Sequence, residues 1–249
     1  MLLSRLRTAT RAGEALAWTA LELARVEARM ALAPEGAREA LFEREMKRWS
    51  RGLLWIGGVR LHLSEGPPPP PHGARLVVAN HRAALDIPIL LSLFGGSVLS
   101  RADLAEWPVL GYAARRAQTI FVDRDSRQSG VKAIRAIREQ LQRGRTVSIF
   151  PEGTTTAGDQ LLPFNSGSFA AARGLPVEIV PVGLAYPSGL EYTEDTFLAH
   201  LGNVGARPRI SIGVAIGPPI AVEARSDRLA QRLQGEIQAL VYRARAAAG

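Results

Sequence analysis

The sequence contains no cysteine, which excludes disulfide bonds, thiolate metal ligands and a cysteine nucleophile. Histidine is scarce as well: only four of the 249 residues are histidine, so few side chains could serve as a general base near neutral pH. The Gly-x-Ser-x-Gly pattern of many serine hydrolases is absent, and so is the phosphate-binding Gly-x4-Gly-Lys-Ser/Thr pattern. A lipase and a P-loop nucleotidase are therefore disfavoured.

Long hydrophobic runs are also missing. A membrane-spanning helix needs about 18 or more apolar residues without charge, and the nearest candidate, Ile87 to Ser100, has 14 residues and contains Pro88. The N-terminus does not match a secretion signal, because charged residues interrupt any apolar segment. They are Arg5, Arg7, Arg11 and Glu14. We expect a protein that stays in the cytoplasm.

The net charge is +8, with a pI near 10.8. Such a charge favours a polyanionic partner, which could be nucleic acid, an anionic lipid surface or a phosphate-bearing substrate. The basic residues are spread along the chain and no nucleic-acid-binding motif is present, so we expect no nucleic-acid partner.

The length and a hydrophobic content of 47% predict one domain with an N-terminal helical appendage. Apolar residues recur with helical spacing from Leu2 to about Leu32, Pro34 interrupts the pattern, and a second helix is expected from Glu35 to Ile56. We assign residues 1–56 to this amphipathic helical pair and residues 57–249 to the main domain. The pair could lie in a membrane interface or pack on the domain as ordinary helices.

Hydrophobic segments and helical segments alternate in the main domain. Strands are expected at Val59–Leu63, Leu76–Ala79, Val98–Ser100, Thr119–Val122, Thr146–Phe150, Glu178–Leu184 and Arg209–Ile216. Helices are expected at Ile87–Phe94, Pro108–Ala114, Ser129–Gln142, Ser166–Arg173 and Arg225–Ala246. The pattern predicts an α/β domain with a central mixed, partly parallel sheet flanked by helices. Pro181 indicates that its strand is an edge strand or carries a bulge.

His81 and Asp86 follow the second expected strand. A histidine with a nearby carboxylate forms a general base whose tautomer is fixed by the acid. Residues five apart diverge by about 140° on a continuous helix, so the pair can meet only if His81 precedes the helix. Pro88 is compatible with a helix that begins near Asp86. The alternative is that Asp86 caps the helix and His81 is an ordinary loop residue.

Two further segments carry polar residues at strand ends. Phe150 to Thr156 places Glu152, Gly153, Thr154 and Thr155 where open α/β sheets gather ligands, although threonine clusters also serve as caps or turns. Arg124 ends another expected strand between two aspartates. It could bind a phosphate with its planar guanidinium or form a surface ion pair.

Four segments in order resemble the sequence blocks of the glycerolipid acyltransferase family, which includes bacterial lysophosphatidate acyltransferases. They are Asn80 to Asp86, Thr119 to Arg124, Phe150 to Thr156 and Val180 to Leu184. The resemblance implies that His81 is the catalytic base and Asp86 its partner. It also implies that Asn80, Arg124, Glu152, Gly153, Thr154 and Thr155 belong to the acceptor site. Thr155 stands where many lysophosphatidate enzymes have arginine, and Leu161 to Gly167 resembles relatives that acylate lyso-ornithine lipids.

The resemblance implies an O-acyltransferase that moves a fatty acyl group from acyl-CoA or acyl carrier protein to the hydroxyl of a lysolipid. We expect 1-acyl-sn-glycerol-3-phosphate as the acceptor and phosphatidate as the product, with a lyso-ornithine lipid or another lysolipid as the alternative acceptor. A non-catalytic lipid-binding membrane protein is the remaining alternative, although a binder does not need His81. We expect no metal or other cofactor, and a peripheral or monotopic location at the anionic cytoplasmic face of the inner membrane.

Overall fold

The structure of the chain is a computed structural model. It describes residues 2–101, 105–106, 110–116, 119–123, 126–193, 196–222 and 225–248. The α-helices are α1 (Leu2–Leu32), α2 (Arg38–Ile56), α3 (Asp86–Phe94), α4 (Leu110–Arg116), α5 (Arg127–Gln142), α6 (Phe197–Ala206) and α7 (Ser226–Ala248). Short 3₁₀ helices span Glu35–Ala37 (η1) and Ser166–Ala172 (η3).

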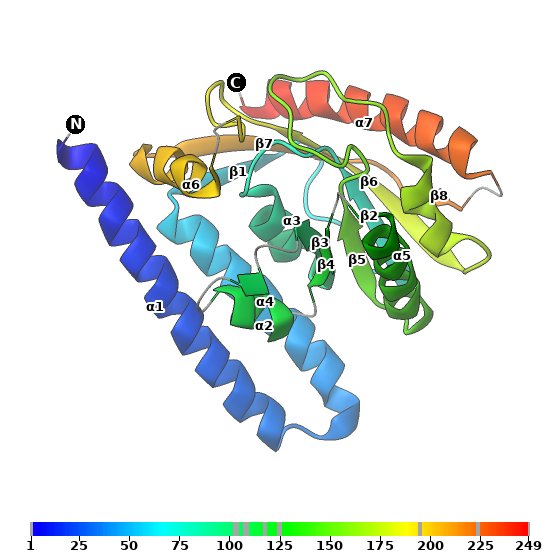
Figure 1. Cartoon of the computed structure of the whole chain (residues 1–249), viewed down its shortest axis with the longest axis horizontal. Coiled ribbons are helices and arrows are strands. Elements are labelled where there is room, and N and C mark those ends of the chain that lie inside the picture. Colours follow the sequence, from blue (N-terminus) through cyan, green and yellow to red (C-terminus); the bar gives the residue numbers. More distant parts are fainter. Residues whose placement is uncertain are drawn as a thin grey trace.

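The strands form one mixed sheet (Figure 1). They are β1 (Val59–Leu63), β2 (Ala74–Ala79), β3 (Ser97–Arg101), β4 (Ile120–Val122), β5 (Thr146–Ile149), β6 (Val177–Ala185), β7 (Ile210–Ile216) and β8 (Ile220–Ala221). The order is β1-β7-β6-β2-β5-β3-β4, and β8 also pairs with β6. Strands β6, β2, β5, β3 and β4 run parallel, whereas β7 and β8 are antiparallel to β6. The expected fold class is confirmed.

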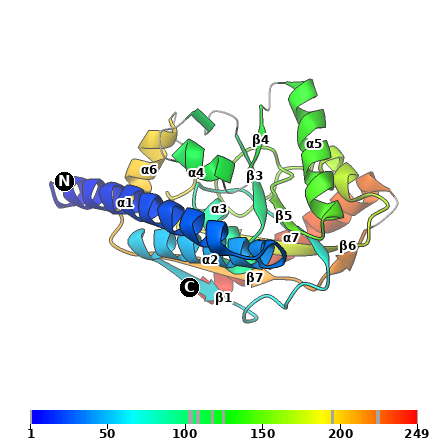
Figure 2. The same ribbon diagram turned by 90° about the horizontal axis from the view of Figure 1, so that it is seen from below.

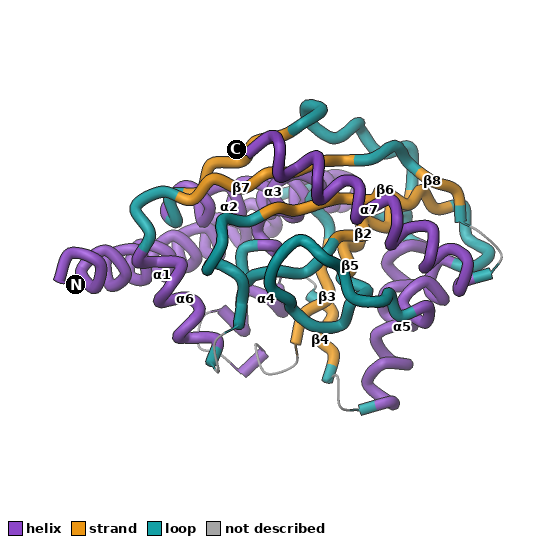
Figure 3. The backbone as a smooth tube through the Cα atoms, turned by 90° about the horizontal axis from the view of Figure 1, so that it is seen from above, coloured by secondary structure: helices purple, strands orange, loops and turns teal. Residues whose placement is uncertain are grey.

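Helices cover both faces of this sheet. Helix α7 lies along β6 and β7 on one face (Figure 3), and α5 and η3 contribute to the same core. Helices α2 and α3 pack on the other face. The buried residues of β2 explain the two cores: Leu76 and Val78 face α7 and α5, whereas Val77 and Ala79 face α2 and α3. Strands that are covered on both sides read as continuous apolar runs, as β2 does.

Pro181 does not mark an edge strand. Strand β6 lies inside the sheet between β2 and β7, so that part of the expectation is wrong. The other expectation, a bulge, stays a prediction, and what the structure shows beside Pro181 is a change of antiparallel partner along β6. Ile179 pairs with Ile220 of β8 and Val182 pairs with Ile216 of β7, and the connection between these two strands passes Pro181. A missing N–H is tolerated where no ladder partner requires it.

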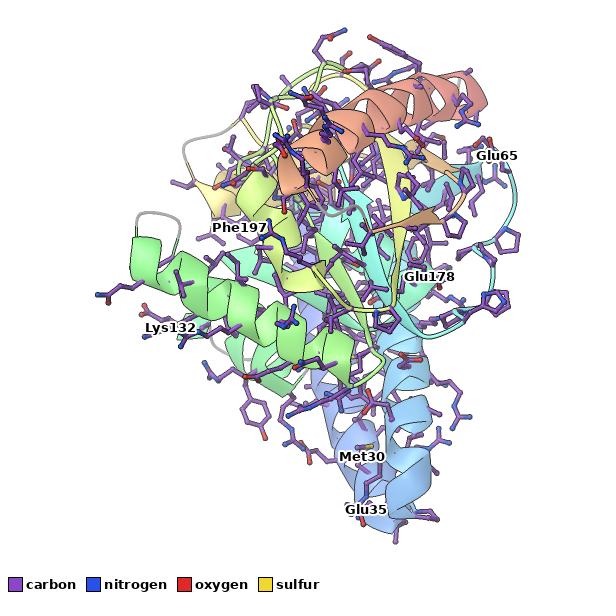
Figure 4. All side chains as sticks on the ribbon, turned by 90° about the vertical axis from the view of Figure 1, so that its right-hand side faces the viewer. Met30, Glu35, Glu65, Lys132, Glu178 and Phe197 are labelled. Atoms are coloured by element: carbon purple, nitrogen blue, oxygen red, sulfur yellow. The ribbon has the colours of Figure 1, made fainter. Side chains whose placement is uncertain are left out.

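The N-terminal pair is a helical hairpin, with α1 and α2 side by side (Figure 2). The break falls at Pro34, as the sequence predicts, and the two α-helices span Leu2–Leu32 and Arg38–Ile56. The far end of the hairpin, with Met30 and Glu35, projects away from the sheet (Figure 4). Helix α2 contributes Phe42 and Met46 to the core with α3. The hairpin is thus packed on the domain.

The two helices of the hairpin are joined by buried charges. The side chains of Glu22 and Glu45 are each 2% exposed and lie between α1 and α2. Arg25 pairs with both carboxylates at 3.1 and 2.9 Å, Arg29 pairs with Glu45 at 2.7 Å, and Arg48 pairs with Glu22 at 3.1 Å. Buried carboxylates are acceptable only when they are paired in this way. In the described part of the chain, no helix is long and apolar enough to cross a membrane.

Two elements were not expected from the sequence, namely α6 and β8. The helix expected at Ser166–Arg173 is present as a 3₁₀ helix, Ser166–Ala172. Helix α6 is held by α1, whose Arg7 and Arg11 donate to the carbonyls of Ala206 and Gly205 at the end of α6. Such contacts between distant segments carry no local sequence signal.

Candidate active site

Three parallel strands bring the candidate residues together at one edge of the sheet. His81 follows β2, Glu152 follows β5 and Tyr186 follows β6. Strand β2 lies between the other two and is parallel to both. Their carboxyl ends therefore meet at the same edge, which is where open α/β sheets bind ligands.

His81 and Asp86 are in direct contact. The distance from His81 Nδ1 to Asp86 Oδ2 is 2.7 Å. His81 lies in the loop and Asp86 is the first residue of α3, so the irregular segment that the spacing requires is present. The Asp86 side chain is fully buried, and the His81 side chain is 12% exposed. With Nδ1–H donated to the carboxylate, Nε2 is the ring nitrogen that can accept a proton from a substrate.

Asp86 accepts four hydrogen bonds. Its Oδ2 accepts from His81 and from the backbone N–H groups of Arg82 and Ala83, at 2.6 and 2.9 Å. Its Oδ1 accepts from the hydroxyl of Tyr186 at 2.6 Å. Helix α3 has no side-chain cap, so the alternative that Asp86 caps this helix does not describe the structure. The carboxylate folds back onto the loop and fixes its shape.

The imidazole of His81 is also held from its face. It stacks on Phe150, with a distance of 4.2 Å between ring centroids and an angle of 14° between the ring planes. The backbone of His81 is bound on both sides, because its N–H donates to Glu152 Oε1 at 2.8 Å and its carbonyl accepts from the N–H of Thr156 at 3.3 Å. An imidazole that is fixed in this way would lose little freedom when it takes up a proton.

Glu152 and Arg82 form a buried ion pair beside the loop that carries His81. Their side chains are 0% and 1% exposed, and Arg82 Nη1 lies 3.3 Å from each carboxylate oxygen of Glu152. Arg82 Nη1 also donates to the carbonyl of His81 and to the hydroxyl of Thr156, and Nε and Nη2 donate to the carbonyls of Gly158 and Gln160. The loop that carries His81, residues 80–85, is called the histidine loop below. The carboxylate of Glu152 connects this loop to the loop that follows β5, because it accepts from the N–H groups of His81 and Leu162. In this structure the side chain of Glu152 is fully buried.

Asn80 joins the ends of β2 and β6. Its side-chain amide donates to the carbonyl of Leu184 at 2.9 Å and its side-chain oxygen accepts from the N–H of Leu184 at 2.8 Å. Asn80 is fully buried. The pair of bonds continues the strand pairing by one step, because Ala79 is already paired with Val182. His81 and Tyr186 therefore both follow closely after a fixed junction.

The other predicted site residues lie at the surface or outside the described residues. Gly153 and Thr154 are exposed, and Gly153 has φ of 74°, which favours glycine. Thr155 is half-buried and its hydroxyl donates to the carbonyl of Tyr192 at 3.1 Å. Arg124 lies outside the described residues. The structure thus brings His81, Asp86, Asn80 and Glu152 together, with the loop of Gly153 to Thr155 beside them.

Sequence reasoning missed three residues of this region. Arg82 and Tyr186 contact Glu152 and Asp86 as described above. His200 of α6 is fully buried, and its Nε2 accepts from the N–H of Ala84 in the histidine loop at 3.1 Å. Of these three, only Arg82 could have been found from the sequence, because it lies inside the block from Asn80 to Asp86. Tyr186 and His200 are about one hundred residues away in the chain.

A comparison with protein families identifies the family of the chain. The model of the family described as "Acyltransferase" matches residues 60–185, which is half of the chain. The matched segment contains His81, Asp86 and Glu152, and it ends one residue before Tyr186. The chain belongs to the acyltransferase family. The resemblance noted in the sequence is therefore confirmed.

Two curated relatives carry different acceptor names. The chain is 35% identical over 153 residues to a 1-acyl-sn-glycerol-3-phosphate acyltransferase of Neisseria meningitidis, a match that covers 61% of this chain and 58% of the relative. It is 37% identical over 157 residues to a lyso-ornithine lipid O-acyltransferase of Pseudomonas aeruginosa, a match that covers 60% of each chain. The chain thus spans less than two thirds of the length of either relative.

A solved structure shows the same fold. The crystal structure of the 1-acyl-sn-glycerophosphate acyltransferase PlsC from Thermotoga maritima superposes with a TM-score of 0.76. The alignment covers 98% of this chain and 96% of the other, at 20% sequence identity. At that identity the likeness concerns the fold alone.

Proposed function

We propose that the protein is an O-acyltransferase that transfers a fatty acyl group from a thioester to the hydroxyl group of a lysolipid. The observation that carries the proposal is the contact of 2.7 Å between His81 and the buried Asp86 at the carboxyl end of β2. A base held this rigidly beside a surface loop suits the removal of a proton from a hydroxyl group.

In the proposed reaction, His81 Nε2 takes the proton of the acceptor hydroxyl while its oxygen attacks the thioester carbonyl carbon. A tetrahedral intermediate forms, the C–S bond breaks, and an ester bond remains. The proton held by His81 passes to the departing thiolate of CoA or acyl carrier protein. Asp86 stabilises the imidazolium that forms between these two steps. These reaction steps need no resident metal or cofactor, and we propose that none takes part.

For the acceptor we propose 1-acyl-sn-glycerol-3-phosphate, which would give phosphatidate. The relatives' names support two acceptors, and Thr155 stands where an arginine would favour a phosphate. A lyso-ornithine lipid is therefore the second candidate. Arg124, Gly153, Thr154 and Thr155 remain the proposed acceptor contacts, whereas the buried Asn80 and Glu152 would support the site from beneath the loop.

The proposal is tested by incubating the purified protein with labelled acyl-CoA or acyl carrier protein and each lysolipid, and by identifying the product by mass. We expect His81→Ala to lower the rate by about 10²–10⁴-fold, as the loss of a general base does. His62→Ala is the matched control, because His62 lies on β1 and contacts Ser211. A folded His81→Ala variant that turns over at the normal rate would exclude the mechanism.

We also propose that the N-terminal hairpin rests on the anionic cytoplasmic face of the inner membrane, which makes the protein peripheral or monotopic. Leucines at the start of α1 support this, since Leu2, Leu3 and Leu6 are 82%, 76% and 63% exposed. Exposed apolar residues beside basic ones are typical of interfacial helices. The sequence left two alternatives open, and the hairpin can satisfy both, because one side packs on the domain and the other is exposed.

Deleting the hairpin would remove Phe42, Met46 and Leu54 from the core, so point substitutions are the better test. We expect the triple change of Leu2, Leu3 and Leu6 to serine to reduce sedimentation with anionic liposomes at least about tenfold, since each buried leucine contributes about 1.5–3 kcal/mol. Val131→Ser on α5 is the control, because Val131 is also exposed. Equal sedimentation of the triple variant and the unchanged protein would place the membrane contact elsewhere.

A further inference from the structure

Tyr186 is the side chain that completes the surroundings of Asp86. It directly follows β6 and is 1% exposed. Its hydroxyl donates to Asp86 Oδ1 at 2.6 Å, while His81 and two backbone N–H groups occupy Oδ2. The two oxygens of the carboxylate are therefore held by separate elements, one by the histidine loop and one by the end of β6.

The position of Tyr186 is itself fixed from two sides. Asn80 joins the backbone of Leu184 to the end of β2, and Arg245 of α7 donates to the carbonyl of Tyr186. Burial, the charge of Asp86 and the hydrogen bond to it raise the pKa of Tyr186 well above its usual value. The hydroxyl therefore keeps its proton and remains a donor at any working pH.

We propose that Tyr186 is a positioning residue that acts on His81 through Asp86. This inference rests on the proposed function. The hydroxyl holds the carboxylate in the plane that His81 Nδ1 needs and takes up part of its negative charge. Without it, Oδ1 would be a buried acceptor without this donor, and the carboxylate could rotate away from the imidazole.

The first test is a double-mutant cycle of Tyr186→Phe and Asp86→Asn, with the transfer rate measured at saturating acceptor. We expect Tyr186→Phe to lower kcat about 10- to 100-fold, as the loss of one hydrogen bond to a charged group does, with KM for the acceptor unchanged. In the Asp86→Asn background, the same change should have no further effect, because the hydroxyl acts through the carboxylate.

A purely structural role gives a different result. It predicts the same loss of rate in both backgrounds, and that outcome would overturn the proposal. If Tyr186→Phe alone does not fold, the Asp86→Asn background still tests the proposal, since the unpaired carboxylate is then absent, and a further loss of rate in the double variant would overturn it. Tyr242→Phe is the matched control. Tyr242 lies on α7, where its hydroxyl accepts from Gln160 at 2.7 Å, and we expect the kcat of this variant to stay within about twofold of the normal value, because an exposed hydrogen bond of this kind contributes little.

The second test does not depend on turnover. In protein labelled with ¹⁵N-histidine, the ring resonances of His81 are assigned by their loss in His81→Ala. We expect Tyr186→Phe to shift the Nδ1 resonance of His81 and Tyr242→Phe to leave it in place. Unchanged His81 resonances in Tyr186→Phe would overturn the proposal. If the unchanged protein transfers acyl groups to none of the lysolipids, the proposed function fails, yet this measurement still decides the role of Tyr186.

Discussion

Replacing Glu152 by glutamine separates its two possible roles. The sequence blocks imply that Glu152 belongs to the acceptor site, whereas the structure buries its carboxylate beside Arg82. Oε1 accepts from the N–H of His81 at 2.8 Å, and Oε2 accepts from the N–H of Leu162 at 2.9 Å. A glutamine has only one acceptor oxygen. Its NH₂ group would therefore face one of these two backbone N–H groups.

The expected loss of stability in Glu152→Gln follows from these contacts. Breaking a buried ion pair by removing one charge typically costs about 3–5 kcal/mol, because the remaining charge has no partner. For a chain of this length, each kcal/mol lowers the melting temperature by about 2–4 °C. We therefore expect Glu152→Gln to lower the free energy of unfolding by about 4 kcal/mol and the melting temperature by roughly 8–16 °C.

The assay is thermal and chemical unfolding, together with KM for the acceptor in the temperature range where the variant is folded. Glu236→Gln is the control. Glu236 pairs with Arg232 at 3.2 Å on the surface of α7, and exposed pairs of this kind contribute about 0–1 kcal/mol. If Glu152→Gln keeps the normal melting temperature and raises KM, the carboxylate contacts the acceptor and the reasoning from burial is refuted.

Three further changes test other parts of the structure. Asn80→Ala should lower the free energy of unfolding by about 2–4 kcal/mol in denaturant titrations, because two buried hydrogen bonds to Leu184 are lost. Gly183→Ala should cost at least about 2 kcal/mol, since an added Cβ would lie 2.4 Å from the backbone of α7, whereas Gly202→Ala, where the space is open, should not destabilise the protein. Arg124→Lys should raise KM for lysophosphatidate if the guanidinium binds the phosphate in a bidentate manner; unchanged KM for both lysophosphatidate and a lyso-ornithine lipid would remove Arg124 from the site.

Local patterns predicted much of the fold and the central pair of the site. The break at Pro34, the buried run of β2 and the helix that begins near Asp86 are all determined by residues close together in the chain. The contact between His81 and Asp86 is one of two alternatives that the spacing leaves open, and the loop before the helix that it requires is present. These predictions succeed because turn residues and hydrophobic spacing act over a few residues.

The errors concern contacts between distant segments. Helix α6 contains Gly202 and Gly205, which disfavour a helix locally, but an added Cβ on Gly205 would lie 3.2 Å from Thr8, so α1 packs closely there. Pro181 predicts an edge strand or a bulge, and the change of partner from β8 to β7 beside it is not visible from the sequence around it. A buried arginine is rare without a partner, and the partner of Arg82 is 70 residues away.

The rigid contacts of the site have a consequence for acceptor choice. Asn80 joins β2 to β6, the Arg82–Glu152 pair joins the loops after β2 and β5, and Tyr186 joins β6 to Asp86. Each of these side chains is buried, so each can hold His81 in place for any acceptor that presents a hydroxyl group. Discrimination between a phosphate and an ornithine headgroup then has to come from residues that reach the surface. Among the predicted acceptor-site residues that the structure describes, Gly153, Thr154 and Thr155 reach the surface, and Arg124 joins them if the acceptor contact proposed for it holds.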